Sequence, residues 1–208
     1  MSVLAFSGAA GTGKSTLLSD VTIPVIALAA EYGRKVVFQE ERARKVFQER
    51  YSLQYDSFEA LLQADPLGYQ LALAEAFRRD AEDALINPET IYIADRTGFD
   101  VACYTMMLGG KGEEDASRIR QIFYLLHQSL HVVDHVFLTQ PFGGMAERDG
   151  FRPAHYEDPA KRALEESMFS HIGVLFPNTT VLPGDRQERV RLVVDTVRDL
   201  LQPAGRIS

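Results

Sequence analysis

The sequence has little of what secretion or membrane insertion requires. Its 208 residues include a single cysteine, Cys103, which cannot form an internal disulfide and suits a reducing compartment. The longest apolar stretch, Val21 to Ala30, is about half the length of a membrane-spanning helix and contains Pro24. The N-terminus lacks the basic and apolar regions of an export signal. We therefore expect a cytoplasmic protein with no membrane partner.

Positive charge is also scarce, because 22 Lys and Arg residues stand against 29 Asp and Glu residues and leave a net charge of −7. Proteins that follow a nucleic-acid backbone usually present a basic face, so this balance makes nucleic acid an unlikely partner. The apolar share of 46% and the charged share of 25% are ordinary for a globular chain. No internal repeat interrupts the sequence, and its length predicts a single domain over residues 1–208.

Short apolar segments alternate with helical segments along the whole chain. Strands are expected at residues 2–6, 35–39, 91–94, 135–139 and 179–182. Helices are expected at 14–32, 42–51, 58–62, 66–86, 98–108, 114–130, 159–172 and 186–201, with a kink or break at Pro24. This pattern predicts an α/β, three-layer fold: a five-stranded parallel sheet with helices on both faces. Ligands of such sheets bind at the carboxyl ends of the strands.

The most specific motif lies between the first strand and the first helix. It fulfils the pattern G-x-x-x-x-G-K-[ST] with Gly8, Ala9, Ala10, Gly11, Thr12, Gly13, Lys14 and Ser15. The glycines allow backbone N–H groups at a helix N-terminus to wrap around phosphates. We expect Lys14 to reach the β- and γ-phosphates of ATP or GTP, Ser15 to bind Mg²⁺, and Thr16 to contact the α-phosphate. A chance glycine-rich turn is the alternative.

An acidic and a basic residue directly follow the third predicted strand. Asp95 occupies the position at which P-loop proteins hold Mg²⁺ or its water, although Asp is also a common helix cap. Arg96 is a candidate for a phosphate contact, with a structural pair to Asp95 as the alternative. We favour a functional role for both side chains.

The second predicted strand also ends on acidic residues. Glu41 is expected to accept a proton from an acceptor hydroxyl or to bind a sugar hydroxyl, and Glu40 is equally eligible. Arg44, one helical turn later, is a candidate for binding the same acceptor. On the long helix, Gln70 and Tyr69 would face an acceptor base or pack in the core.

Residues 141–158 are rich in glycine, proline and charge and are predicted to form a lid. Arg148 and Arg152 on such a segment would neutralise the charge that develops on the γ-phosphate once water is expelled. An ordinary solvated loop is the alternative, but long loops in compact domains are often functional.

Three stretches carry a resemblance to a known family. Asp95 to Tyr104 resembles the D-R-x-x-x-D-x-x-x-Y stretch of P-loop nucleoside and nucleotide kinases. Glu41 to Arg44 is similar to the E-x-A-R segment of a branch that includes ribosylnicotinamide kinase domains and AAA-like ATP-binding proteins, and Asp149 to Arg152 resembles the D-G-x-R of its lid. The resemblance implies a kinase fold that uses ATP and Mg²⁺. It also implies that Asp95 or Glu41 is the carboxylate on the acceptor side, that Asp100 helps to bind the acceptor, and that residues 183–185 lie near the adenine.

These observations together predict an ATP- and Mg²⁺-dependent phosphotransferase, a kinase acting on a nucleoside, a nucleotide monophosphate or a related small metabolite. The main alternative is an ATP-hydrolysing regulatory NTPase without a small-molecule acceptor. A kinase acting on modified bases in DNA is disfavoured by the acidic net charge. A homodimer is compatible with the sequence. The identity of the acceptor stays open.

Overall fold

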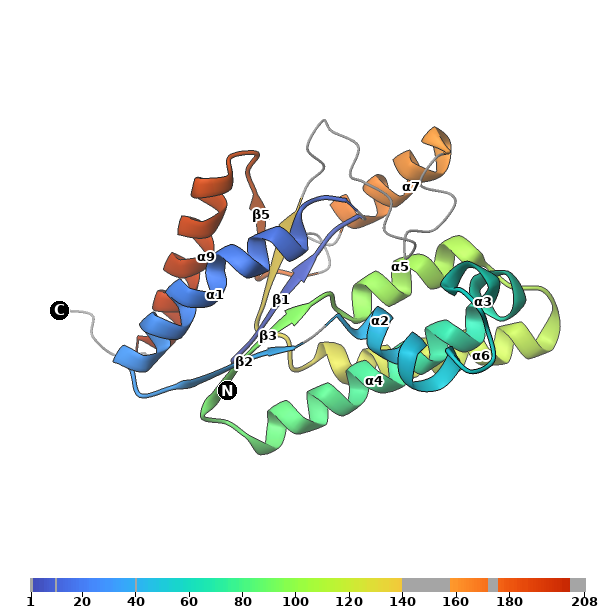
Figure 1. Ribbon diagram of the computed structural model, residues 1–208, viewed down its shortest axis with the longest axis horizontal. Helices are drawn as coiled ribbons and strands as arrows, with labels where there is room; N and C mark the ends of the chain where they lie inside the picture. The colour runs from blue at the N-terminus through green and yellow to red at the C-terminus, as the bar shows by residue number, and fades with distance from the viewer. Residues whose placement is uncertain (1, 10, 40, 140–157, 172–175, 203–208) are drawn as a thin grey trace.

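The computed structural model describes residues 2–9, 11–39, 41–139, 158–171 and 176–202, and a parallel sheet forms its middle layer (Figure 1). The strands are β1 (Ser2–Ser7), β2 (Lys35–Gln39), β3 (Thr90–Asp95), β4 (His135–Thr139) and β5 (Thr179–Leu182). They pair in parallel in the order β2-β3-β1-β4-β5. The predicted five-stranded α/β fold is thereby confirmed.

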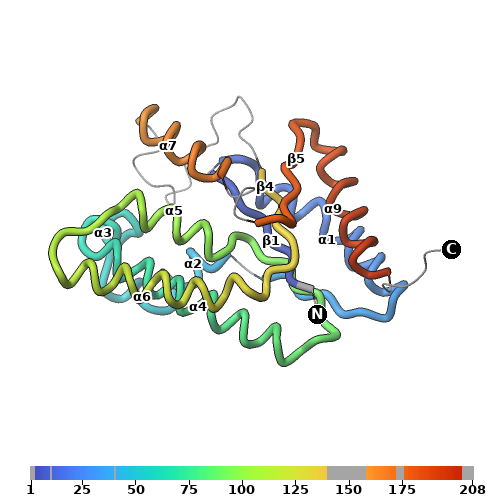
Figure 2. The backbone as a smooth tube through the Cα atoms, turned by 180° about the vertical axis from the view of Figure 1, so that it is seen from behind, coloured from blue at the N-terminus to red at the C-terminus, as the bar shows by residue number. Residues whose placement is uncertain are grey.

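Helices cover both faces of this sheet (Figure 2). On one face lie α1 (Lys14–Glu31) and α9 (Arg186–Leu201), and on the other lie α4 (Pro66–Ile86), α5 (Gly98–Leu108) and α6 (Gly112–Leu130). The remaining helices are α2 (Arg42–Val46), the π-helix η1 (Phe47–Tyr51), α3 (Phe58–Ala64) and α7 (Pro159–Ser170). In the described part of the chain, no helix has the length and apolar character needed to span a membrane. Pro24 lies within α1, which continues past it, so the helix is not broken there.

The central strand shows why its sequence is an unbroken apolar run. Leu4 and Phe6 of β1 pack toward α1 and α9, whereas Val3 packs toward Tyr92 of β3 and Ala84 of α4. Because successive side chains of a strand point to opposite faces, a strand that is covered on both sides needs apolar residues at every position. This arrangement buries β1 and leaves only its carboxyl end open to a ligand.

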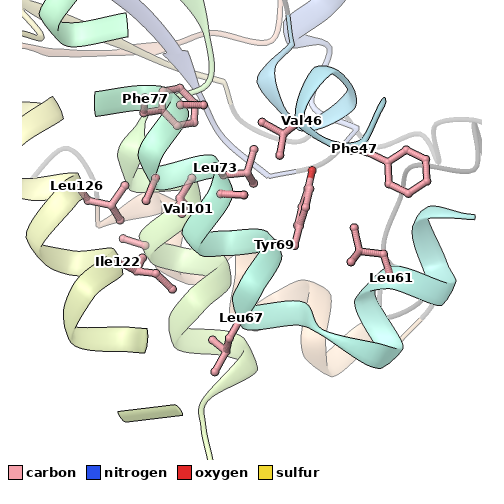
Figure 3. Close-up of a cluster of buried hydrophobic side chains, with 14 of the residues drawn as sticks. Val46, Phe47, Leu61, Leu67, Tyr69, Leu73, Phe77, Val101, Ile122 and Leu126 are labelled. Carbon is pink, nitrogen blue, oxygen red and sulfur yellow. The ribbon is translucent and has the colours of Figure 1, made fainter. Parts of the chain in front are cut away.

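A second core lies beside α4 and is built by helices alone (Figure 3). The 21-residue α4 is about 30 Å long, so it is longer than the short strands of the sheet and extends beyond their ends. It ends just before β3, so its N-terminal half extends toward the carboxyl edge of the strands, where it packs against α2 and α3. Tyr69 is central to this contact, with Val46 and Leu61 nearby (Figure 3). Packing in this core thus places residues of the N-terminal half of α4 at the ligand-binding edge of the sheet.

The segment expected as one helix over 42–51 changes its hydrogen-bond pattern at Phe47. The N–H of Ser52 donates to the carbonyl of Phe47 at 2.9 Å, the spacing of a π-helix. The rings of Phe47 and Phe58 meet edge-on with 5.8 Å between their centres, and the centres of the Tyr51 and Tyr69 rings are 6.1 Å apart. The wider turn therefore accompanies tertiary aromatic contacts, which the local sequence pattern does not reveal.

Candidate functional site

The glycine loop joins β1 to α1 at the carboxyl edge of the sheet. Gly8, Gly11 and Gly13 have φ angles of 141°, 79° and 83°, in the region that side chains with a Cβ rarely adopt. Gly13 is the N-cap of α1, so the loop leads directly into the N-terminus of an 18-residue helix. The backbone is therefore folded as an anion-binding turn requires.

Gly8 is also one of the points at which this loop touches β4. A Cβ at Gly8 would lie 2.4 Å from the carbonyl oxygen of Thr139 and 2.5 Å from its Oγ1. We expect Gly8→Ala to lower the free energy of unfolding by about 2 kcal/mol or more, because a backbone group must move. Gly33→Ala is the matched control, since its φ is also positive, at 64°, but nothing lies within 4 Å of the added Cβ. Urea unfolding of both variants measures the difference, and equal losses would contradict the clash.

Lys14 is buried and bonded to its own loop. Its Nζ donates to the carbonyl oxygens of Gly8 at 2.6 Å and Ala9 at 2.8 Å. Burial, followed by the positive charge of Arg96, lowers the pKa of Lys14 to about 8. The burial of this ammonium group thus favours an anion beside it.

A hydrogen-bond network of hydroxyl groups links the glycine loop to its neighbours. Thr12 Oγ1 donates to the carbonyl of Ala9 at 2.9 Å and lies 2.6 Å from Thr139 Oγ1. Thr139 in turn donates to the carbonyl of Ser7 at 3.1 Å, and Ser7 Oγ donates to Asp100 Oδ2 at 2.8 Å. The loop is therefore connected to β4 and to the first turn of α5.

Asp95 ends β3 beside the end of β1. It is 7% exposed, and its Oδ1 is buried without a hydrogen-bond partner among the described residues. Burial raises the pKa of the Asp95 carboxyl, and the positive charges of Arg96 and Lys14 oppose this. A buried oxygen without a partner is destabilising, so Oδ1 is available to a metal ion, a water or a hydroxyl group.

Arg96 is held in a strained conformation. Among the described non-glycine residues it alone has a positive φ, 86°, and its N–H donates to the carbonyl of Phe6 at 2.9 Å. Its guanidinium lies 3.4 Å from Asp100 Oδ1 and 5.8 Å from the ring centre of Tyr104. Among the described residues, the ion pair of Arg96 is thus with Asp100 rather than with Asp95. Strained residues fixed from several sides are typical of functional sites.

Asp100 is engaged within the protein. Its Oδ2 accepts hydrogen bonds from Ser7 Oγ and from the N–H of Thr97, with which it forms the capping box of α5. It is 1% exposed. These contacts suit a support of α5 and of the loop, and the predicted contact with an acceptor stays a prediction.

The residues after β2 lie beside α4. Glu41 is the N-cap of α2, and its Oε2 lies 2.7 Å from Arg44 Nε. Tyr69 donates its hydroxyl to the carbonyl of Ala43 at 2.8 Å and so fastens α2 to α4. The next residue, Gln70, is 5% exposed, and its Oε1 has no partner among the described residues. This side of the site offers a carboxylate, a guanidinium and an amide oxygen.

A small cavity lies behind Arg96, between the sheet and α4. Its lining includes Ala5, Ala94, Phe77 and Asp80. The volume of about 30 Å³ holds about two water molecules and is too small for a nucleoside. This cavity is therefore not a nucleoside pocket.

The other predicted residues divide into two groups. Ser15 and Thr16 lie in the first turn of α1 with exposed side chains, as the predicted contacts of Ser15 with Mg²⁺ and of Thr16 with the α-phosphate would require. Ala10, Arg148 and Arg152 lie outside the described residues, as do Glu40 and Asp149. Their predicted roles and the lid over 141–158 stay predictions.

Arg189 of α9 is a site residue that sequence reasoning missed. It is 3% exposed, and its guanidinium donates to the carbonyl of Pro183 at 2.5 Å and to that of Thr12 at 3.1 Å. The glycine loop is thereby tied to the loop after β5. The signal in the sequence is an arginine at helical spacing from the buried Val193 and Val197, on a face that is otherwise apolar.

Comparison with known families extends over most of the chain. The model of a family described as an AAA domain matches residues 3–189. This agrees with the resemblance that the motifs carry. None of the curated proteins matches the chain.

Solved structures share the fold at low sequence identity. NadR in complex with NR has a TM-score of 0.64, and NadR in complex with NAD and AMP-PNP has one of 0.61, each at 18% identity over 100% of this chain. This chain spans about half of those two, 54% and 51%. Thymidylate kinase from Candida albicans has a TM-score of 0.62 at 15% identity, covering 96% of this chain and 92% of its own. The likeness identifies the three-layer fold of P-loop kinases.

Proposed function

The chain belongs to this AAA domain family, and from that premise we propose that it is an ATP- and Mg²⁺-dependent phosphotransferase. The acceptor is a nucleoside, a nucleotide monophosphate or a related small metabolite. The observation that carries the proposal is the convergence of Lys14, Asp95 and Arg96 at one edge of the sheet, beside a loop folded for phosphates. Similar folds include a thymidylate kinase and a protein bound to AMP-PNP, which supports this class.

The glycine loop forms the donor side in this proposal. Backbone N–H groups of residues 8–13 surround the phosphates, Lys14 lies beside the β- and γ-phosphates, and Thr16 contacts the α-phosphate. Ser15 and Asp95 fit a Mg²⁺ site, because both offer hard oxygen atoms and Asp95 Oδ1 has no hydrogen-bond partner in the described part of the chain. When bound, Mg²⁺ would neutralise negative charge on the phosphates.

The acceptor side comprises Glu41, Arg44 and Gln70. Glu41 is half-buried at the mouth of the site and accepts the proton of the attacking hydroxyl, while Arg44 orients its carboxylate at 2.7 Å. Gln70 presents its buried Oε1 to a donor on the acceptor. Arg96 stabilises charge on the transferred phosphoryl group.

Residues 141–158 complete the domain as a lid in this proposal, with Arg148 and Arg152 over the γ-phosphate. A single domain over residues 1–208, the cytoplasmic location and a homodimer belong to the same set of proposals. None of them is required by the geometry of Lys14 and Asp95.

The test is a screen of acceptors with Mg²⁺·ATP, in which melting temperature and phosphate transfer are measured together. Nucleosides, nucleotide monophosphates and DNA carrying modified bases are the three sets of acceptors. We expect one small acceptor to be phosphorylated and to raise the melting temperature. ATP hydrolysis with no response to any acceptor would instead assign the regulatory NTPase, and transfer to DNA would assign the third function.

Lys14 makes nucleotide binding dependent on pH. Its pKa is about 8 in the empty protein, and a triphosphate beside it would raise that pKa again. We therefore expect ATP binding near pH 8.5 to take up a fraction of one proton, about a half or more, and the affinity to fall as the pH rises above about 8. Calorimetry in buffers with different ionisation enthalpies measures the uptake. Lys14→Met should lose it, and an unchanged uptake in that variant would assign the proton to another group.

A further inference from the structure

A buried carboxylate from α7 reaches the candidate site across α5. Glu165 is 0% exposed, and its Oε1 accepts a hydrogen bond from the hydroxyl of Tyr104 at 2.6 Å. One helical turn later, Phe169 packs edge-on against the same ring with 6.0 Å between the ring centres. Helix α7 lies along α5 in both views (Figures 1 and 2). Two residues of α7 therefore fix the hydroxyl and the ring of Tyr104.

The ring of Tyr104 also contacts the strained Arg96. The Arg96 guanidinium lies 5.8 Å from the centre of the Tyr104 ring, a cation–π contact. A phenol that donates its proton to a carboxylate has a more electron-rich ring, which strengthens the attraction for the guanidinium. Arg96 NH1 is also 3.4 Å from Asp100 Oδ1. The orientation of Arg96 thus depends on groups from α5 directly and on α7 through Tyr104.

Burying the carboxylate of Glu165 destabilises the fold, whereas apolar packing alone would hold α7 against α5. Removing a carboxylate from water is costly, and an apolar pair of similar volume would hold α7 against α5 at least as well. The negative charge also acts on the phosphate side, because it is one of the charges that raise the pKa of Lys14 against the effect of burial. A purely structural contact between α5 and α7 would not need this charge.

We propose that Glu165 and Tyr104 are positioning residues that hold the Arg96 guanidinium at the phosphate edge of the site, so that the seating of α7 controls the orientation of Arg96. This inference rests on the proposed function for its rate measurement. It assigns to α7 a role in the reaction that neither the glycine loop nor the acceptor side supplies.

The experiment compares Glu165→Gln and Tyr104→Phe with the wild type and with Arg96→Ala. Gln keeps the shape and an acceptor for the Tyr104 hydroxyl, and Phe keeps the ring. We expect kcat at saturating ATP to fall about tenfold in both variants, because Arg96 is misplaced, with KM for ATP changed by less than about twofold. In the Arg96→Ala background, Glu165→Gln should have no further effect on kcat. Melting temperatures confirm that each variant is folded at the assay temperature.

Glu166→Gln is the matched control, because Glu166 is the adjacent acid of α7, is partly exposed and lies 3.8 Å from Arg162. It should keep the wild-type kcat. The proposal is overturned if Glu165→Gln leaves kcat unchanged, or if it lowers kcat by the same factor with and without Arg96. If the wild type transfers phosphate to no acceptor, the proposed function fails separately. The same four combinations of Glu165 and Arg96 are then compared by the rate of ATP hydrolysis, where a loss only in the presence of Arg96 supports the coupling and an equal loss or no loss overturns it.

Discussion

Lys14→Met is expected to lower kcat for phosphotransfer by roughly 10³-fold, through loss of the positive charge beside the transferred phosphoryl group. The empty protein should be at least as stable as the wild type. Lys14 has a pKa of about 8 in the folded state against the ordinary lysine value of 10.5, so the folded state binds its proton less tightly. The resulting penalty on folding is fully present below pH 8 and is lost as the pH rises toward 10.5. Met keeps most of the side-chain volume and removes that penalty.

Kinetics and urea unfolding of the same preparations test this combination. The gain in stability from Lys14→Met should be largest near pH 7 and should shrink at higher pH. Lys35→Met is the control, because Lys35 is exposed at the start of β2, and it should change neither rate nor stability. A Lys14→Met protein that retains more than about a tenth of the wild-type kcat would contradict the role of Lys14 on the donor side.

The sequence was sufficient where the signal is local. Helix α4 runs from Pro66 to Ile86 as predicted, because Pro suits the first turn and Asp65 caps it by accepting from the N–H of Gly68. Strands β2, β4 and β5 also have their predicted bounds, since each is a short apolar run between helices. The order of the strands in the sheet was not predictable from these runs, because it depends on which face each connecting helix covers.

The residues of the candidate site likewise divide into those that a local pattern predicts and those that only the fold brings together. Lys14 was predicted from the glycine-loop motif and Asp95 from its place after an apolar strand, and the fold brings the carboxyl ends of parallel strands together. The contacts of Glu165 with Tyr104 and of Arg189 with Thr12 join residues 61 and 177 positions apart. No local pattern links such pairs, because only the sheet topology and the packing of α7 and α9 bring them together. Arg96 was a candidate by position, but its positive φ and its partners required the fold.

Asp95→Asn is expected to lower kcat by about 10²-fold to 10³-fold and to raise the Mg²⁺ concentration needed for half-maximal rate. The amide keeps the shape of the side chain but is a weaker ligand for a divalent cation. The same change should stabilise the empty protein at neutral pH. Burial raises the pKa of Asp95 in the folded state above 3.8, so the penalty of the ionised form is present above the folded pKa and is lost as the pH falls through 3.8.

Titration of Mg²⁺ against rate separates the two carboxylates that the resemblance left open. If Asp95 serves the metal and Glu41 the acceptor hydroxyl, Asp95→Asn shifts the Mg²⁺ dependence, and Glu41→Gln lowers kcat without shifting it. The opposite pattern would exchange the two roles. Asp56→Asn is the control, since Asp56 is exposed in the loop before α3 and should leave both quantities unchanged. Because Asp95 Oδ1 is buried without a partner among the residues that the structure describes, while Glu41 Oε2 lies 2.7 Å from Arg44 Nε, we expect the first pattern.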